Sequence, residues 1–332
     1  HGETVCMAGR TVAWRSHGKS AFANLEDATG PIQLYFKKNV LGDESFADLD
    51  LLDLGDWVGV KGRVFRTRMG EVTVAVESWT LLTKSLRPPP FGKVEVDAET
   101  GERTVHSGFA DTEARYRQRY ADLAVNPDVR DVFRTRARII TELRSFLDQE
   151  GFLEVETPAL QPLYGGASAR PFVTKHNALD RTMYLRIADE LYLKRLIVGG
   201  LDRVYELSKD FRNEGIDRFH NPEFTMLEWY QAFTDYEDQM NLVERMVRHV
   251  TQAVLGTMTF RFGDDELDVS EPFRRIRLVD ALSEALARDV HEFTDDELRS
   301  RAEALSIPEL DGAGRGKLID KLFGELVEPG LV

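Results

Sequence analysis

Residues 211–230 carry arginine, glutamate, histidine and aromatic side chains at spacings that suit the binding of a nucleotide. The stretch has the sequence FRNEGIDRFHNPEFTMLEWY. An arginine fork can make two parallel hydrogen bonds to a phosphate or a carboxylate, and an aromatic ring gives a purine a surface to stack on. Acidic side chains on the same surface can receive an ammonium group or an exocyclic amine. The residue types therefore predict a site for a nucleotide beside a cationic group.

Two antiparallel strands joined by a loop would position these side chains. The run YELSKD is typical of a strand, the charged EGIDRFHNP has turn chemistry, and FTMLEWYQAF returns to an extended apolar pattern. Side chains alternate along a strand, so we expect Arg212 and Glu214 to point the same way. On the second strand, one face should carry Phe224, Met226, Glu228 and Tyr230. From spacing alone, a surface hairpin with scattered charges is an open alternative.

The pattern Phe-Arg-x-Glu, a loop and His-x-x-x-Phe resembles motif 2 of the class II aminoacyl-tRNA synthetases. It is carried here by Phe211, Arg212, Glu214, His220 and Phe224. The longer text FRNEGI…HNPEFTMLEWY is similar to the lysyl branch of that family. The resemblance implies ATP-dependent attachment of lysine to tRNA(Lys) through a lysyl-adenylate intermediate, with ATP and Mg²⁺ as cofactors.

The resemblance also implies roles for single residues. Arg212 would bridge the α-phosphate of ATP and the carboxylate of lysine, and would be the catalytic residue. Glu214, His220 and Asn221 would orient ATP, and Phe224 would stack on adenine. In many bacterial relatives an arginine directly precedes HNPEF, whereas here Phe219 holds that position and Arg218 comes before it.

Two further segments contribute to the lysine site that the resemblance implies. Gly166 of YGGASARPF and Glu190 of ADELYLKRL match positions that line the amino-acid site and receive its α-ammonium. Glu190 also has a simpler explanation, because a helix dipole favours an acidic residue in the first turn. Glu228 and Tyr230, with Arg212, complete the expected set of lysine-binding residues.

Residues 4–82 contain five short strand patterns with a helical stretch after the third, the order of an OB-fold barrel. Phe22 and Gln33 would lie on its second and third strands. A ring can stack an unpaired base and an amide can hydrogen-bond its edge, although the residues alone favour a place for Phe22 in the core. The segment resembles the anticodon-binding domain of class IIb synthetases, which implies that Phe22 and Gln33 hold the central U, with Arg15 and Glu71 assisting.

Composition limits the class of protein. The 332 residues are 42% hydrophobic and 30% charged, with a single cysteine and a net charge of -14. One cysteine excludes an intramolecular disulfide and a Cys-rich zinc site. No long apolar run or signal peptide is present, so we expect no membrane association and a cytoplasmic protein. The negative charge disfavours non-specific RNA binding over the whole surface, so tRNA must meet a local basic patch.

The expected fold class is α+β, in three parts. Residues 1–85 form the OB-fold barrel and residues 86–128 a linker with a polar insertion, which we expect to be a surface hairpin. Residues 129–332 form a class II catalytic domain with an antiparallel sheet and flanking helices. An amphipathic helix from about Val129 to Gly151, followed by a strand broken at Pro158, resembles motif 1 and implies a homodimer.

The family's third motif and its glutamate-rich magnesium segment do not occur before Val332. We therefore expect a C-terminally incomplete fragment that is inactive alone, with no metal ligands in this chain. Three alternatives stay open. A class IIb synthetase for aspartate or asparagine shares the barrel and motifs, a paralogue that lysylates a translation factor lacks the barrel, and a half-synthetase could bind tRNA without catalysis.

Overall fold

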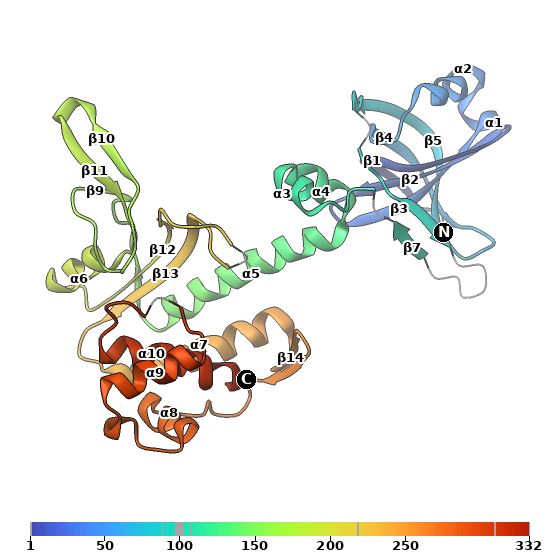
Figure 1. The fold of residues 1–332 in the computed structure, drawn as a ribbon. Helices are drawn as coiled ribbons and strands as arrows, with labels where there is room; N and C mark the ends of the chain where they lie inside the picture. Colours follow the sequence, from blue (N-terminus) through green and yellow to red (C-terminus); the bar gives the residue numbers. More distant parts are fainter. Residues whose placement is uncertain are drawn as a thin grey trace. The chain divides into compact units, whose positions relative to one another are not determined.

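The computed structural model describes residues 2–87, 89–96, 103–106, 108–217, 219–308 and 310–331 (Figure 1). The chain divides into two compact units, residues 1–134 and residues 135–332. Each unit is described by itself. In the described part of the chain, no helix combines the length and the apolar character that crossing a bilayer requires.

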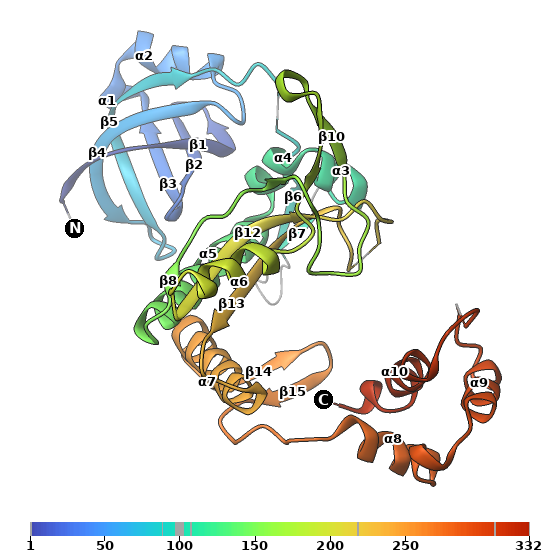
Figure 2. The ribbon, with the colours of Figure 1, turned by 90° about the vertical axis from the view of Figure 1, so that its left-hand side faces the viewer.

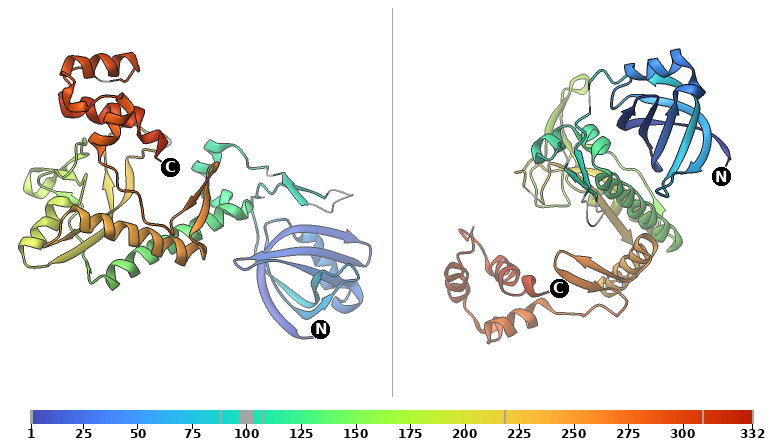
Figure 3. Two further views of the ribbon diagram at one scale, coloured as in Figure 1. Left: turned by 90° about the horizontal axis from the view of Figure 1, so that it is seen from below. Right: turned by 90° about the vertical axis from the view of Figure 1, so that its right-hand side faces the viewer.

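The first unit contains a closed barrel of five strands in the order β1-β2-β3-β5-β4 (Figure 3). The short helices α1 and α2 and the 3₁₀ turn η1 lie between β3 and β4, as predicted for an OB-fold, and the fold class is confirmed. The elements are β1 (Thr4–His17), β2 (Ser20–Asp27), β3 (Gly30–Lys37), α1 (Lys38–Leu41), α2 (Asp43–Ala47), η1 (Asp48–Leu51), β4 (Trp57–Arg66) and β5 (Val72–Thr83).

Period-two alternation builds the barrel. Ala21, Ala23 and Leu25 of β2 are buried in its core, while the residues between them lie on the outer face. The buried carboxylate of Asp56 lies directly before β4. It accepts hydrogen bonds from the Lys84 ammonium at 2.7 Å and from the Ser85 backbone at 2.7 Å, and so ties β4 to the segment leaving β5.

The polar insertion forms the expected hairpin, with β6 (Lys93–Val96) antiparallel to β7 (Arg103–His106). The tip of this hairpin lies outside the described residues. Helices α3 (Thr112–Arg117), α4 (Arg119–Val125) and α5 (Pro127–Gln149) follow. Asp122 of α4 is fully buried and pairs with the guanidinium groups of Arg115 and Arg119. The charges of these two arginines are therefore already partly compensated within the protein.

The second unit is built on the antiparallel pair β12 (Arg203–Phe211) and β13 (Glu223–Gln231), with β8 (Leu153–Glu154) added to β12 (Figure 2). The β8–β12 pairing is parallel, so this sheet is mixed rather than wholly antiparallel as we expected. A second sheet has the order β10-β11-β9. The elements beside the β12–β13 pair are β9 (Leu160–Gln161), β10 (Val173–His176), η2 (Asn177–Leu179), β11 (Arg181–Leu185) and α6 (Glu190–Val198).

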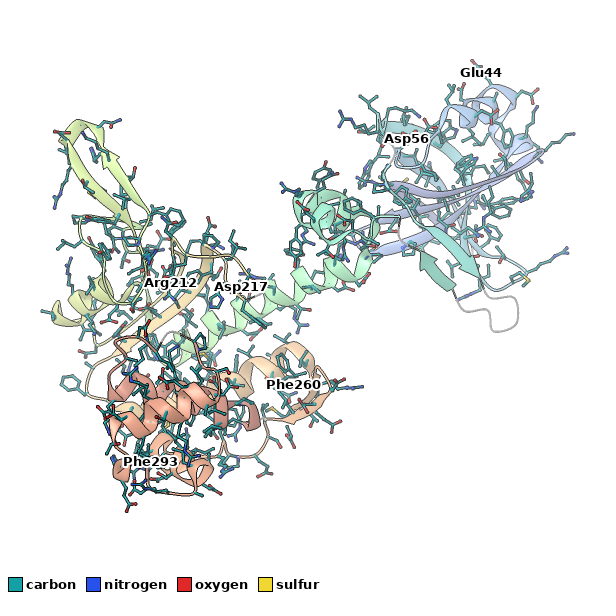
Figure 4. All side chains as sticks on the ribbon, in the orientation of Figure 1. Glu44, Asp56, Arg212, Asp217, Phe260 and Phe293 are labelled. Atoms are coloured by element: carbon teal, nitrogen blue, oxygen red, sulfur yellow. The ribbon has the colours of Figure 1, made fainter. Side chains whose placement is uncertain are left out.

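Helix α7 (Tyr236–Leu255) begins with a capping box at Asp235 and contributes Leu242 and Met246 to the core under the β12–β13 sheet. The final residues form a helical cluster with its own core around Leu282, Leu298 and Phe293, which is labelled in Figure 4. The remaining elements are β14 (Thr259–Phe262), β15 (Asp265–Asp268), α8 (Leu278–Leu286), η3 (Val290–Glu292), α9 (Asp295–Ala304), α10 (Arg315–Leu326) and η4 (Glu328–Gly330).

Candidate functional site

The β12–β13 pair presents the predicted nucleotide-binding residues at one end. Asp210 lies opposite Phe224 in the antiparallel register, and Arg212 follows directly after β12 (Figure 4). The Arg212 backbone N–H donates to the Pro222 carbonyl at 2.9 Å, which holds the arginine beside the start of β13. Its guanidinium carbon lies 5.1 Å from the centre of the Phe224 ring. The residue predicted to bind phosphate and the residue predicted to stack on the purine are therefore neighbours.

Arg212 keeps hydrogen-bonding capacity for a ligand. Its Nε is buried and makes no hydrogen bond to any residue that the structure describes. A buried donor without a partner costs free energy, and an anion placed at the guanidinium would remove that cost.

Arg212 and Glu214 both lie beyond the end of β12, so our prediction that they point the same way as residues of one strand is wrong in its premise. Strand β12 ends at Phe211, and the Glu214 backbone N–H turns back to the Arg212 carbonyl at 3.0 Å. The turn-forming sequence NEG ends the strand before the ladder reaches Glu214. The Glu214 carboxylate instead accepts from the Arg170 backbone at 3.3 Å.

The loop between the strands places His220 and Asn221 at its exit. His220 is exposed, and its Nδ1 lies 2.7 Å from Asp217 Oδ2. Hydrogen bonds from the Phe219 backbone and from His220 hold the pKa of Asp217 below its usual range. Asn221 Nδ2 donates to the Glu223 carbonyl at 2.6 Å. Phe219, which stands where many bacterial relatives have an arginine, is exposed, and Arg218 before it lies outside the described residues.

The four predicted lysine-binding positions besides Arg212 form one connected group. Gly166 has φ of +91°, and a Cβ there would lie 2.8 Å from the Cβ of Glu190. The Glu190 carboxylate pairs with Lys194 at 2.7 Å, and the Lys194 ammonium lies 5.8 Å from the Tyr230 ring centre. The Tyr230 hydroxyl donates to Glu228 Oε2 at 3.4 Å. The glycine thus allows the loop to pack against the first turn of α6.

Burial shifts the acidity of this group. Desolvation raises the pKa of Glu228, and it raises the pKa of Tyr230 together with the negative charges of Glu228 and Glu190. Burial thus makes the charged form of each group less favourable than it is in water, and a cation placed between them would favour the Glu228 carboxylate.

Sequence inspection missed a second set of polar residues beneath this site. Arg186, Asp189, Glu206, Ser208 and Asp210 are all buried. The last three occupy every second position of β12, and a run of polar residues on the buried face of a strand is the signal that could have revealed them.

On the barrel, Phe22 lies on the outer face and is not part of the core. Its ring stacks on Tyr35 at 4.6 Å, and Arg15 lies opposite Phe22 in the β1–β2 register. One face of the Phe22 ring is thus covered by Tyr35. A base could stack only on the other.

Gln33 is 8% exposed and anchored at both ends of its amide. Its Nε2 donates to Glu71 at 2.9 Å, and its Oε1 accepts from the Thr73 hydroxyl at 2.9 Å. A primary amide has two N–H groups and two acceptor sites, so one of each stays available for the edge of a base. Glu71 therefore fixes the orientation of Gln33.

Models of known protein families match both the barrel and the segment that follows it. A family model described as tRNA synthetases class II (D, K and N) matches residues 111–311, and one described as an OB-fold nucleic acid binding domain matches residues 5–82.

Curated relatives match along the whole chain. A lysine–tRNA ligase of Carboxydothermus hydrogenoformans is 47% identical over 99% of the chain and 65% of its own length. Those of Syntrophomonas wolfei and Aquifex aeolicus are 49% and 48% identical, over 65% and 53% of their lengths. The chain thus spans less than two thirds of these relatives.

Proposed function

Because the chain belongs to the class II tRNA synthetases of the D, K and N group, we propose that its protein joins lysine to tRNA(Lys) at the expense of ATP. The observation that carries the choice of lysine is the 47–49% identity to lysine–tRNA ligases along the whole chain. The connected group of Gly166, Glu190, Glu228 and Tyr230 supports it, because these acidic and aromatic side chains suit an amino acid with a cationic side chain.

The activation step needs positioning and charge compensation. The lysine carboxylate would attack the α-phosphorus of ATP and displace pyrophosphate, and the terminal ribose hydroxyl of tRNA would then take the lysyl group. Arg212 would counter the negative charge that grows on the α-phosphate, and Phe224 would hold the adenine. Glu214, His220 and Asn221 would orient the nucleotide from the loop.

Magnesium, when bound with ATP, would supply positive charge that compensates the charge of the phosphates. The described residues contain one group of three acidic side chains close enough to share an ion, Asp189, Asp210 and Glu228. The Arg186 guanidinium lies 3.1 Å and 3.3 Å from the two aspartates, and that positive charge disfavours a divalent cation there. We therefore assign no magnesium ligand in this part of the chain.

Amino-acid-dependent exchange of pyrophosphate into ATP tests the proposal. The protein encoded by the complete gene should exchange with lysine and not with aspartate or asparagine, and the 332-residue chain is assayed beside it. Exchange with aspartate or asparagine alone would assign the chain to that specificity instead.

Arg212→Ala should lower the rate of exchange about 10²- to 10³-fold, the usual effect of removing a group that stabilises transition-state charge. Arg261→Ala, on the exposed hairpin β14–β15, is the matched control and should keep the parent rate. Equal rates for the two variants would contradict the role of Arg212.

The barrel would bind the anticodon, with Phe22 stacking the central U, Gln33 reading its edge, and Arg15 and Glu71 assisting. Phe22→Ala should weaken binding of a UUU anticodon stem-loop about 10- to 100-fold, because stacking contributes about 1–3 kcal/mol per base. Phe262→Ala, whose ring is 71% exposed on β14, controls for loss of an aromatic side chain. Fluorescence anisotropy measures both, and unchanged affinity in Phe22→Ala would exclude this platform.

We further propose a cytoplasmic homodimer. Helix α5 leaves Val132 and Phe133 66% and 45% exposed, and apolar side chains on a helix face are suited to a subunit contact.

A further inference from the structure

Asp189, Asp210 and Glu228 form an acidic cluster at the base of the candidate lysine site. One carboxylate oxygen from each residue lies within 4.8 Å of the others. Asp189 and Asp210 are 0% exposed, whereas Glu228 is half-buried and faces Tyr230. Glu228 is therefore the member of the cluster that a ligand can reach.

The cluster carries more negative charge than its surroundings balance. Arg186 makes its shortest contact with Glu206, at 2.7 Å, and also lies 3.1 Å from Asp189 and 3.3 Å from Asp210. The Arg186 guanidinium thus serves three buried carboxylates, and the charge of Arg212 acts on Asp210 in addition, which still leaves fewer positive than negative groups. Uncompensated buried charge is costly, so the surplus must be balanced by a proton or by a bound cation.

Hydrogen-bond geometry around Ser208 indicates that the cluster holds a proton. The Ser208 oxygen lies 2.8 Å from Asp189 Oδ2 and 3.1 Å from Asp210 Oδ1. A hydroxyl has one hydrogen and cannot donate fully to both carboxylates. Both contacts become good hydrogen bonds if one aspartate is protonated and donates to the Ser208 oxygen. Burial also raises the pKa of Asp189 to about 7 and raises the pKa of Asp210.

Two carboxylate oxygens in the cluster make no well-formed hydrogen bond. Asp189 Oδ1 and Asp210 Oδ2 are buried without a hydrogen-bond partner among the described residues, and Asp189 Oδ1 has only the ion pair with Arg186 at 3.1 Å. The Asp189 backbone N–H meanwhile donates to Glu228 Oε1 at 3.2 Å, which joins the aspartates to the residue at the pocket surface. A positive charge arriving at Glu228 would therefore act on all three carboxylates within a short distance.

We propose that Asp189 and Asp210 are positioning residues that make the pocket selective for a cationic amino acid: the cluster holds a proton while the pocket is empty and releases it when the side-chain ammonium binds against Glu228. The ammonium supplies the positive charge that the proton supplied, and the proton leaves to solvent. This inference rests on the proposed function, because it takes lysine as the amino acid.

Calorimetry of the complete protein in buffers of different ionisation enthalpy measures the protons released on binding. Lysine should release about half a proton at pH 7 and more at pH 6, because a group with a pKa of about 7 is half protonated at that pH. Norleucine has the same α-amino and α-carboxyl groups without the side-chain ammonium, and it should release much less.

Asp189→Asn and Asp210→Asn should abolish the additional release and weaken lysine binding about tenfold, while norleucine affinity stays within about twofold. Asp202→Asn, an exposed residue just before β12, is the matched control. If a variant does not fold, the comparison of lysine with norleucine in the unmodified protein still tests the inference.

Equal proton release by lysine and norleucine between pH 6 and pH 8 would overturn the inference. So would Mg²⁺ that displaces the proton and competes with lysine, since the cluster would then be a metal site. Lysine-dependent pyrophosphate exchange in the same protein separates the two proposals. Exchange without the additional proton release refutes the charge-reading role alone, and absence of exchange refutes the proposed function.

Discussion

Arg186 and the carboxylates around it show how one side chain can set the chemistry of a pocket that it does not line. Its guanidinium donates to Glu206 at 2.7 Å and to the Lys209 carbonyl at 2.9 Å, so its position is fixed from two directions. Glu206 in turn accepts from the Thr157 hydroxyl at 2.7 Å. Glu206 is thus fully satisfied, and the imbalance of charge falls on Asp189 and Asp210.

The pH dependence of stability should reveal the buried Asp189. Burial raises the pKa of Asp189 from 3.8 to about 7, so the folded protein binds more protons than the unfolded chain between these values. The stabilisation this gives is present at low pH and lost as pH rises through about 7. We expect the free energy of unfolding of Asp189→Asn, relative to the parent, to increase from about pH 4 to about pH 8.

Urea denaturation at several pH values measures this difference. Asp202→Asn, which is exposed, should show no such trend. A difference between Asp189→Asn and the parent that is constant with pH would mean that Asp189 is ionised throughout.

The sequence explains why Asp189 was not predicted. It directly precedes α6, where an aspartate is an ordinary N-cap, yet its side chain makes no capping hydrogen bond and turns to Ser208 instead. Its partners Ser208 and Asp210 belong to β12, which follows α6 in the sequence. Contacts between residues about 20 positions apart leave no local sequence pattern. Glu190 and Arg212, in contrast, occur in continuous motifs, which is why the sequence alone suggested them as site residues.

Among the elements, β4 shows how a strand depends on its glycines. A Cβ on Gly62 would overlap the carbonyl of Ala75 on the paired strand β5, beside the irregularity in the β4–β5 register between Lys61 and Gly62. A Cβ on Gly59 of the same strand would meet the side chain of Leu82 at 3.6 Å, an ordinary contact. The two positions therefore form a matched pair.

Gly62→Ala should destabilise the barrel by about 3 kcal/mol or more, because the backbone of two paired strands must move apart. Gly59→Ala should stay within about 1 kcal/mol of the parent, since loss of unfolded-state entropy offsets any small clash. Denaturation followed by tryptophan fluorescence measures both, as Trp14, Trp57 and Trp79 lie on the barrel strands. Similar losses in the two variants would contradict the close approach at Gly62.

Local pattern explains which elements could be predicted. The barrel strands alternate buried and exposed residues and are separated by turns, so their number and order followed from the sequence. Strand β8 could not be delimited in this way. It has two residues and pairs in parallel with β12, so its extent is set by a distant partner and not by its own composition.

For the whole molecule, charge and exposed apolar surface point to different partners. A net charge of -14 repels nucleic acid over most of the surface, so the proposed recognition of tRNA would depend on small groups of residues such as the one around Arg15 and Phe22. On α5, Val132 and Phe133 are exposed although they continue the apolar pattern of the helix. Sequence periodicity predicted the helix, but it could not show that these side chains are uncovered in a single chain.

Val132→Asp should weaken the proposed homodimer at least about 100-fold, because association would bury a carboxylate without a partner. The change should lower the exchange rate at dilute protein concentrations, where the variant dissociates first. Sedimentation velocity over a range of concentrations measures the shift from dimer to monomer. Val198→Asp, at an 89% exposed position of α6, controls for the added charge and should sediment as the parent does. A parent that stays monomeric at micromolar concentration, or a Val132→Asp variant with an unchanged dissociation constant, would exclude this face of α5 as the subunit contact.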